Sequence, residues 1–131
     1  MNAFDEVSVD PKSFAWLNLI GQDKWVDFTP TFSLTVVGTP TYSGRFKIVG
    51  RQCFFQVKLV SSTSIASTAG THYLNLPIAA KGYGGMATMQ NRTTHIAVGV
   101  CEIDADTSRC YLPTQGASGN TFTVAGFYEI G

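Results

Sequence analysis

The chain has 131 residues, which suits one domain, and 44% of them are apolar while only 14% are charged. Nine Lys and Arg residues balance nine Asp and Glu residues, so the formal charge is zero and no basic tract is available to neutralise a row of phosphates. This composition predicts a chain that buries a core, does not bind nucleic acid and hides part of its surface against partners.

The sequence carries no pattern for membrane insertion, export or cysteine cross-linking. No apolar run approaches the roughly 18–20 residues that span a bilayer. The start, "MNAFDEVSVD", lacks a basic segment followed by an apolar one, so we expect a soluble protein without a secretory signal. Cys53, Cys101 and Cys110 are odd in number and lack CxxC spacing, which predicts reduced thiols rather than disulfides or a zinc site.

The first predicted element is a short helix between Asp10 and Gly21. Asp10 can accept hydrogen bonds from the first free amides, Pro11 suits the first helical position, and Gly21 can end the helix. Its apolar residues leave almost no polar face, and they are Phe14, Trp16, Leu17, Leu19 and Ile20. Because isolated helices of this length are marginal in water, the helix must lie against something. We call residues 1–21 the arm and expect Phe14, Trp16 and Ile20 to dock on a partner.

The stretch "KWVDFTPTF", residues 24–32, is predicted to be a first edge strand. Pro30 lacks an amide proton and is tolerated only at an edge or at the start of a strand, and it forces Thr29 into an extended conformation. Trp25, Phe28 and Phe32 can then pack along a rim. We expect this rim to close the domain onto its neighbours.

Seven or eight short strands are predicted after the arm, because residues 22–131 alternate β-branched and aromatic segments with turn residues. The predicted fold is all-β, an antiparallel β-sandwich or jelly roll. The segments are "TFSLTVVG", "RFKIVG", "QCFFQVKLV", "HYLNLP", "HIAVGVCEI", "RCYLP" and "FTVAGFYEI".

In two of these segments, the alternation of residues predicts which faces of the strand are buried. In "CFFQVKLV" the alternation places one set of residues in the core, namely Cys53, Phe55, Val57 and Leu59. In "HIAVGVCEI" neither face is polar, so both faces need cover from a loop, the helix or another subunit. We expect Ile96, Val98 and Val100 to form part of an oligomer interface together with the rim aromatics.

The segment from Lys81 to Thr94 has a weakly structured composition and is predicted to be a long loop. Its glycines, "GYGG", lack the ending of a phosphate-binding loop, so they are expected only to make the chain flexible. Tyr83, Gln90 and Asn91 on it are candidate ligand-binding residues. We favour the other interpretation for Tyr83 and the neighbouring methionines, Met86 and Met89, namely that they are apolar cover for a sheet edge.

The acidic residues Glu102, Asp104 and Asp106 are interpreted as part of a hairpin. They do not match a calcium loop, which needs a glycine at its sixth position and a glutamate at its twelfth. With Asp104–Thr107 as a four-residue loop, Glu102 faces Arg109 and Cys101 faces Cys110, a register that the opposite charges favour. We predict no metal site.

No catalytic group or cofactor site is predicted. His72 and His95 are the only histidines, and both fall in strand-like patterns, where packing beside a strand is the simpler interpretation. We therefore expect that the protein is not an enzyme.

The opening stretch also resembles a known group of proteins. Together with "GTPTYSGRFKIVGRQCFFQVKLV" and "HYLNLPIAA", it looks like the small β-sandwich modules of structural proteins of tailed bacteriophages, across Trp25 to Gly131. The first matching motif is Trp-x-x-aromatic-Thr-Pro-Thr-aromatic, at Trp25, Phe28, Thr29, Pro30, Thr31 and Phe32. The others are a Gly-bounded strand at Gly44, Phe46, Ile48, Val49 and Gly50, and a Leu-x-Leu-Pro strand end at Leu74, Leu76 and Pro77.

The resemblance implies a virion component, made in the host cytoplasm, that docks on the head or tail as a decoration or fibre protein. It also implies a homotrimer, since such modules are commonly trimeric, with other virion proteins as partners. A tail-fibre tip that binds a receptor or a host surface glycan would use the same fold, and we keep it as the alternative.

Overall fold

The computed structural model describes residues 24–131, in which every regular element is a β-strand. The first six strands are β1 (Val26–Phe28), β2 (Phe32–Ser33), β3 (Thr35–Val37), β4 (Thr41–Val49), β5 (Gln52–Val60) and β6 (Ser64–Ser67). The next six are β7 (Tyr73–Asn75), β8 (Gly85–Asn91), β9 (Ile96–Asp104), β10 (Arg109–Tyr111), β11 (Gln115–Ser118) and β12 (Thr121–Glu129). The all-β prediction is confirmed. The predicted helix and the docking residues Phe14, Trp16 and Ile20 lie outside the described residues.

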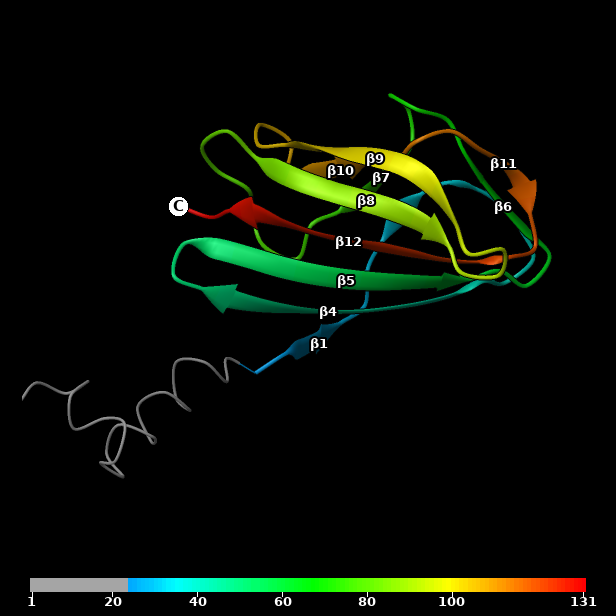
Figure 1. Ribbon diagram of the computed structural model, residues 1–131, viewed down its shortest axis with the longest axis horizontal. Helices are drawn as coiled ribbons and strands as arrows, with labels where there is room; N and C mark the ends of the chain where they lie inside the picture. Colours follow the sequence, from blue (N-terminus) through cyan, green and yellow to red (C-terminus); the bar gives the residue numbers. More distant parts are fainter. Residues whose placement is uncertain (1–23) are drawn as a thin grey trace, which may run out of the picture.

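Two antiparallel sheets contain all of these strands. Nine strands form one sheet in the order β1-β4-β5-β12-β8-β9-β10-β7-β2, and the other three form the sheet β11-β6-β3. The four longest strands and β8 lie together in the larger sheet, with β12 between β5 and β8 (Figure 1).

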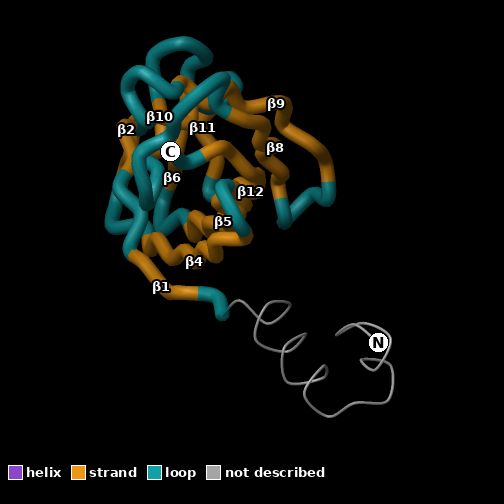
Figure 2. Tube along the Cα trace, turned by 90° about the vertical axis from the view of Figure 1, so that its left-hand side faces the viewer, coloured by secondary structure: helices purple, strands orange, loops and turns teal. Residues whose placement is uncertain are grey.

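The larger sheet curls so that its two ends approach each other (Figure 2). Its end strands β1 and β2 are separated by only three residues in the chain, 29–31. The aromatic ring of Phe32 in β2 lies 4.8 Å from that of Tyr42 in β4, which is next to the opposite end of the sheet. A short link therefore joins the two ends of one sheet.

This link explains the sequence "KWVDFTPTF". Phe28 ends β1, which pairs with β4, and Phe32 begins β2, which pairs with β7. Pro30 between them is buried, and because it has no amide proton it interrupts the pairing at the point where the chain changes partners. The predicted edge strand is thus two short strands, one at each end of the sheet.

The core fills the inside of the curl. Cys53, Phe55, Val57 and Leu59 are all buried, so the predicted core face of β5 is confirmed. β12 pairs with β5 over nine residues and with β8 over seven, and its inward residues Phe122, Val124 and Tyr128 are buried as well.

The prediction of a long loop from Lys81 to Thr94 is wrong. Residues Gly85–Asn91 form β8, which pairs with β12 on one side and β9 on the other. Ala87 and Met89 face the core and are buried, while Thr88 and Gln90 point outward. Pairing on both sides explains why a segment with weak strand composition is a strand here, since tertiary context outweighs β-propensity.

Candidate functional site

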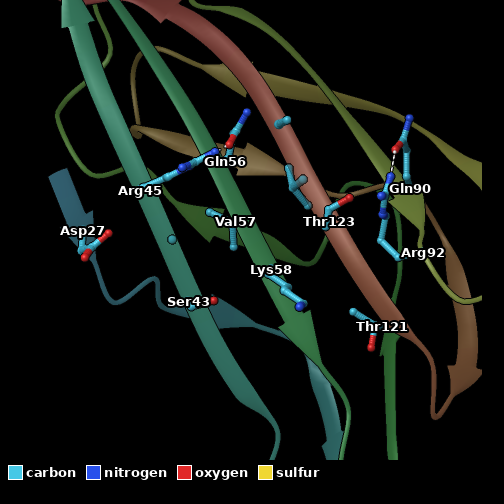
Figure 3. A pocket seen from close by; sticks show the side chains of 13 residues that line it. Asp27, Ser43, Arg45, Gln56, Val57, Lys58, Gln90, Arg92, Thr121 and Thr123 are labelled. Atoms are coloured by element: carbon cyan, nitrogen blue, oxygen red, sulfur yellow. Dashed lines mark hydrogen bonds between the residues drawn. The ribbon is translucent and has the colours of Figure 1, made fainter. Parts of the chain in front are cut away.

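An open groove lies on the outer face of the larger sheet, across β4, β5, β12 and β8. Its volume is about 800 Å³. Alternation produces it: the residues next to the buried core positions point outward, and these are mostly polar. The polar lining residues, all labelled in Figure 3, are Asp27, Ser43, Arg45, Gln56, Lys58, Gln90, Arg92, Thr121 and Thr123. We call this the groove.

The strand register aligns the groove residues in two rows. Arg45, Gln56 and Ala125 are successive partners across β4, β5 and β12. Ser43, Lys58, Thr123 and Gln90 form the next row. The groove floor is therefore a regular array of side chains held by long, paired strands rather than by loops.

Arg45 is fixed by two neutral neighbours. Its Nε donates a hydrogen bond of 2.9 Å to Oε1 of Gln56, and its guanidinium carbon lies 4.6 Å from the centroid of the Trp25 ring. The amide and the indole orient the guanidinium without cancelling its charge. The remaining N–H groups of Arg45 can bind an anion.

Arg92 has a similar arrangement at the other side of the groove. It follows β8, where its backbone N–H donates to the carbonyl of Thr121 at 2.8 Å. Its Nη1 donates to Oε1 of Gln90 at 3.3 Å, so its side chain also rests on a neutral amide (Figure 3). Lys58 lies between the two arginines, with Ser43 and Thr123 as cross-strand neighbours.

One carboxylate lies at the margin of the groove. Asp27 in β1 is the register partner of Arg45. The groove thus presents three cationic side chains and one anionic side chain, with hydroxyl and amide groups between them. Such a surface suits a polar ligand with a net negative charge.

An apolar row borders the groove on the same face. Phe54, Phe127 and Met86 are successive partners across β5, β12 and β8. Trp25 lines a second hollow together with Phe54 and Phe127, and its ring lies below Lys47. The rings of Phe54 and Phe127 are 5.9 Å apart. Phe127 is 44% exposed and Met86 58% exposed. We call Trp25, Phe54, Phe127 and Met86 the apolar row.

Apart from Trp25, which belongs to the apolar row, the residues predicted for an oligomer interface fall into two groups. Phe28 and Phe32 are partly buried against the core of their own chain, where Phe28 packs edge-on to Phe46 at 5.7 Å. Val98 is also partly buried. Ile96 and Val100 in β9 are instead 64% and 71% exposed.

The predicted ligand loop is not a single site, because its residues lie at opposite ends of β8. Tyr83 precedes the strand and is fully exposed, whereas Gln90 and Asn91 end it. Asn91 is buried, and its Oδ1 accepts hydrogen bonds from the amides of Thr93 and Thr94, so it shapes a turn. Gln90 lines the groove.

The acidic hairpin exists, but its predicted register is wrong. Arg109 faces Asp104 and Cys110 faces Ile103, so the four-residue loop is 105–108 rather than 104–107. Asp104 shapes this loop: its Oδ1 accepts from the amide of Asp106 and its Oδ2 from the hydroxyl of Thr107. Between residues 24 and 131, no three His, Cys, Asp or Glu side chains form a group that could hold a metal ion.

The histidines have structural positions. His72 Nδ1 accepts a hydrogen bond of 2.8 Å from the amide of Thr68. His95 lies in the turn between β8 and β9 rather than in a strand, and its φ of 63° is in the left-handed region. The predicted strand position of His95 was wrong because the four-residue turn occupies residues 92–95.

The three cysteines are free and buried in the core. Cys110 is hydrogen-bonded to Cys101, and this bond together with burial raises the pKa of the Cys110 thiol above its usual range. Burial raises the pKa of Cys53, which contacts the Tyr128 hydroxyl. The thiols of Cys53 and Cys110 are therefore held in their neutral form and are poor nucleophiles.

Sequence reasoning missed Arg45, Lys58 and Arg92 as site residues. The signal lay in strands such as "QVKLV" and "GRFKI", where charged residues alternate with core residues. The neighbouring order of β4, β5, β12 and β8 was needed to bring them together.

The comparisons with known proteins give no relative: no family model, no curated protein and no solved structure matches the chain. In the part of the chain that the structure describes, no helix is long and apolar enough to cross a membrane.

Proposed function

We propose that this protein is a β-sandwich structural module on the surface of a tailed-bacteriophage particle, where it forms a symmetric oligomer, most simply a homotrimer. The observation that carries the proposal is the set of exposed apolar side chains on the outer face and on β9. Phe127, Met86, Ile96 and Val100 are 44%, 58%, 64% and 71% exposed. Phe127, Met86 and Val100 lie on the outer face of the neighbouring strands β12, β8 and β9, and exposed apolar side chains on one face are typical of sites that a partner covers.

The sandwich architecture is part of this proposal. The curled sheet would divide into two facing layers, with β1 in one layer and β2 in the other. The contact between Phe32 and Tyr42 supports this division, since it joins strands from opposite ends of the sheet. The link between β1 and β2 also carries the Thr-Pro-Thr motif of the phage modules that the sequence resembles.

Identical subunits are the preferred cover for the exposed side chains. Closed cyclic symmetry buries the same patch on every copy and stops growth, whereas open-ended contacts would form fibres. The number three comes from the resemblance to phage modules. The low charge of the chain supports the same proposal, because only 14% of its residues are charged.

The oligomer can be tested with Val100→Asp in the full-length protein. A buried carboxylate at an interface is strongly unfavourable, so we expect the wild type to be an oligomer and the variant to be a monomer. Val37→Asp is the matched control, since Val37 is a 54% exposed valine in β3 of the smaller sheet and should leave the oligomer intact. Sedimentation velocity at micromolar concentration measures both, and a monodisperse wild-type monomer would refute the assembly.

The particle location needs a separate experiment. Purified virions labelled with an antibody against this protein should show it on the head or the tail, with other virion proteins as its partners. Deleting residues 1–20 should leave a folded oligomer that no longer joins the particle, because the arm is proposed to dock there. Virions that lack the protein would contradict the location, and normal incorporation of the shortened chain would contradict the role of the arm.

A second candidate is a carbohydrate-binding fibre tip, and the groove is the observation that favours it. Amide and hydroxyl groups on a rigid sheet, beside exposed aromatic rings, suit the hydroxyls and apolar faces of sugars. We also propose that the protein has no enzymatic activity, since the His72 imidazole accepts a hydrogen bond from the backbone and His95 lies in a turn. Turnover of a polysaccharide that disappears in His72→Ala would contradict this.

A further inference from the structure

We propose that the groove binds an acidic saccharide chain, meaning a glycan that carries carboxylate groups at intervals. This inference rests on the second candidate function, carbohydrate binding, and specifies its ligand class. The chain would lie across β4, β5, β12 and β8, with its carboxylates on Arg45, Lys58 and Arg92.

The arginines carry the argument for negative charge in the ligand. Each is oriented by a glutamine oxygen, at 2.9 Å for Arg45 and 3.3 Å for Arg92. A neutral acceptor holds the side chain in place but leaves its positive charge unbalanced. A guanidinium that is oriented in advance loses less entropy on binding a carboxylate, and it can bind it through two parallel hydrogen bonds.

The spacing of the cations argues for an extended ligand rather than a single small anion. Three strand spacings separate β4 from β8, and four residues separate the register positions of Arg45 and Arg92 along β5. At about 4.8 Å per strand and about 3.3 Å per residue, their Cα atoms are on the order of 20 Å apart. Lys58 lies between them, so a chain with repeated charges can contact all three.

The groups between the cations favour a saccharide over a nucleic acid. Ser43, Thr121 and Thr123 can donate and accept hydrogen bonds, as sugar hydroxyls do. Asp27 beside Arg45 can accept a hydrogen bond from a sugar hydroxyl. Three cations in a chain of zero net charge are also few for binding nucleic acid.

The apolar row supplies a further contact at one margin of the groove. A second hollow, lined by Trp25, Phe54 and Phe127, shares Gln56 and Ala125 with the groove. A sugar ring has an apolar face that can pack on an aromatic side chain. One end of the saccharide would therefore rest on aromatic rings while its acidic groups reach the cations.

The test is a glycan array that carries uronate and sialate oligosaccharides beside their uncharged counterparts, probed with the full-length protein. We expect retention of carboxylated glycans and weaker binding as salt is raised. Arg45→Ala and Lys58→Ala should each lower the affinity for the best-bound glycan by at least about tenfold, as loss of a charged hydrogen bond predicts.

Two exposed cations outside the groove provide matched controls. Arg51→Ala and Lys81→Ala should bind as the wild type does, since neither side chain lines the groove. Arg45→Gln keeps the polar contact with Gln56 without the charge and should also lose affinity. Unchanged thermal melting temperatures would show that the groove variants remain folded.

Each other outcome overturns the proposal in a distinguishable way. Equal binding of charged and uncharged glycans would leave the carbohydrate-binding candidate standing and refute the acidic ligand. No glycan above background would refute both. Binding of single-stranded DNA that is lost in Arg45→Ala, without glycan binding, would assign the groove to nucleic acid instead.

Discussion

Tyr128 is a fully buried side chain whose hydroxyl serves the backbone of a loop. It donates to the carbonyl of Ile78 at 2.7 Å and accepts from the amide of Ile78 at 3.2 Å. Burial raises the pKa of Tyr128 well above its usual value of 10.0, and the bond with Cys53 adds to this shift. The phenol must therefore stay protonated in the folded state.

The raised pKa of Tyr128 predicts a loss of stability in alkali. The folded state binds the proton more tightly than the unfolded state, so the contribution is complete below about pH 10 and declines as the pH rises above that value. Tyr128→Phe should flatten this decline, although it should also lower stability at pH 7 by about 1–3 kcal/mol because Ile78 loses its partner. Urea unfolding between pH 7 and 11 measures both effects.

The control for the alkaline profile is Tyr83→Phe. The side chain of Tyr83 is fully exposed, so this change should leave the pH profile of the wild type as it is. A decline of equal slope in Tyr128→Phe would contradict the assignment and point to the buried thiols of Cys53 and Cys110, whose pKa values are also raised.

His95 and Ser108 occupy the same position in two successive hairpins. Each is the fourth loop residue after an Asn or Asp that shapes the turn, and their φ values are 63° and 56°. Left-handed backbone is costly for β-branched residues. His95→Val should therefore destabilise the protein by about 1–2 kcal/mol, whereas His95→Gly should be tolerated.

Chemical denaturation checks this backbone prediction. Thr94→Val is its control, because it introduces the same side chain at an exposed neighbouring position whose φ is not positive. If Thr94→Val and His95→Val cost the same, the left-handed backbone is not the cause.

At the scale of elements, β1 has only three residues and is held to β4 by an aromatic ring. The Phe28 ring lies over its register partner Gly44, where a Cβ atom would be 2.7 Å from the ring. Gly44→Ala should displace Phe28 and cost about 1–3 kcal/mol. Gly116→Ala in β11, where nothing lies within 4 Å of the added carbon, should change the free energy of unfolding by less than about 0.5 kcal/mol.

Strand alternation predicted some elements well and failed for others. The predicted core face of β5 was correct because the alternate residues Cys53, Phe55, Val57 and Leu59 are all apolar. The hairpin register was wrong because Arg109 finds an acidic partner in either alignment, Glu102 or Asp104, so charge pairing could not choose. Burial could not choose either, since Cys110 faces a buried residue in both alignments, Cys101 or Ile103.

At the scale of the whole molecule, the all-β class could be predicted, but the groove could not. Each groove strand shows its outward polar residues in sequence, as Gln56 and Lys58 do in β5. Their neighbours come from residues about 30 to 70 positions further along the chain, through the pairing of β5 with β12 and of β12 with β8. A site that is assembled from strand order leaves no local motif.

The closure of the larger sheet could be predicted only in part from the sequence. The sequence predicted that the segment from Trp25 to Phe32 lies at an edge and that Pro30 limits its pairing. The strands on the two sides of Pro30 lie at opposite ends of one sheet. This arrangement depends on the curl of the sheet, which places the Phe32 ring against Tyr42 and could not be predicted from the segment itself.

β12 is the last strand in chain order, yet it lies between β5 and β8 in the middle of the larger sheet. On a ribosome that has translated as far as β11, the strands β1, β4 and β5 share no backbone ladder with β8 and β9. In such a nascent chain the edges of β5 and β8 that β12 later covers are unpaired, and unpaired edges favour aggregation at high synthesis rates. The larger sheet can therefore be completed only after translation of Thr121–Glu129, and a chain that stops before Thr121 should lack the intact sheet.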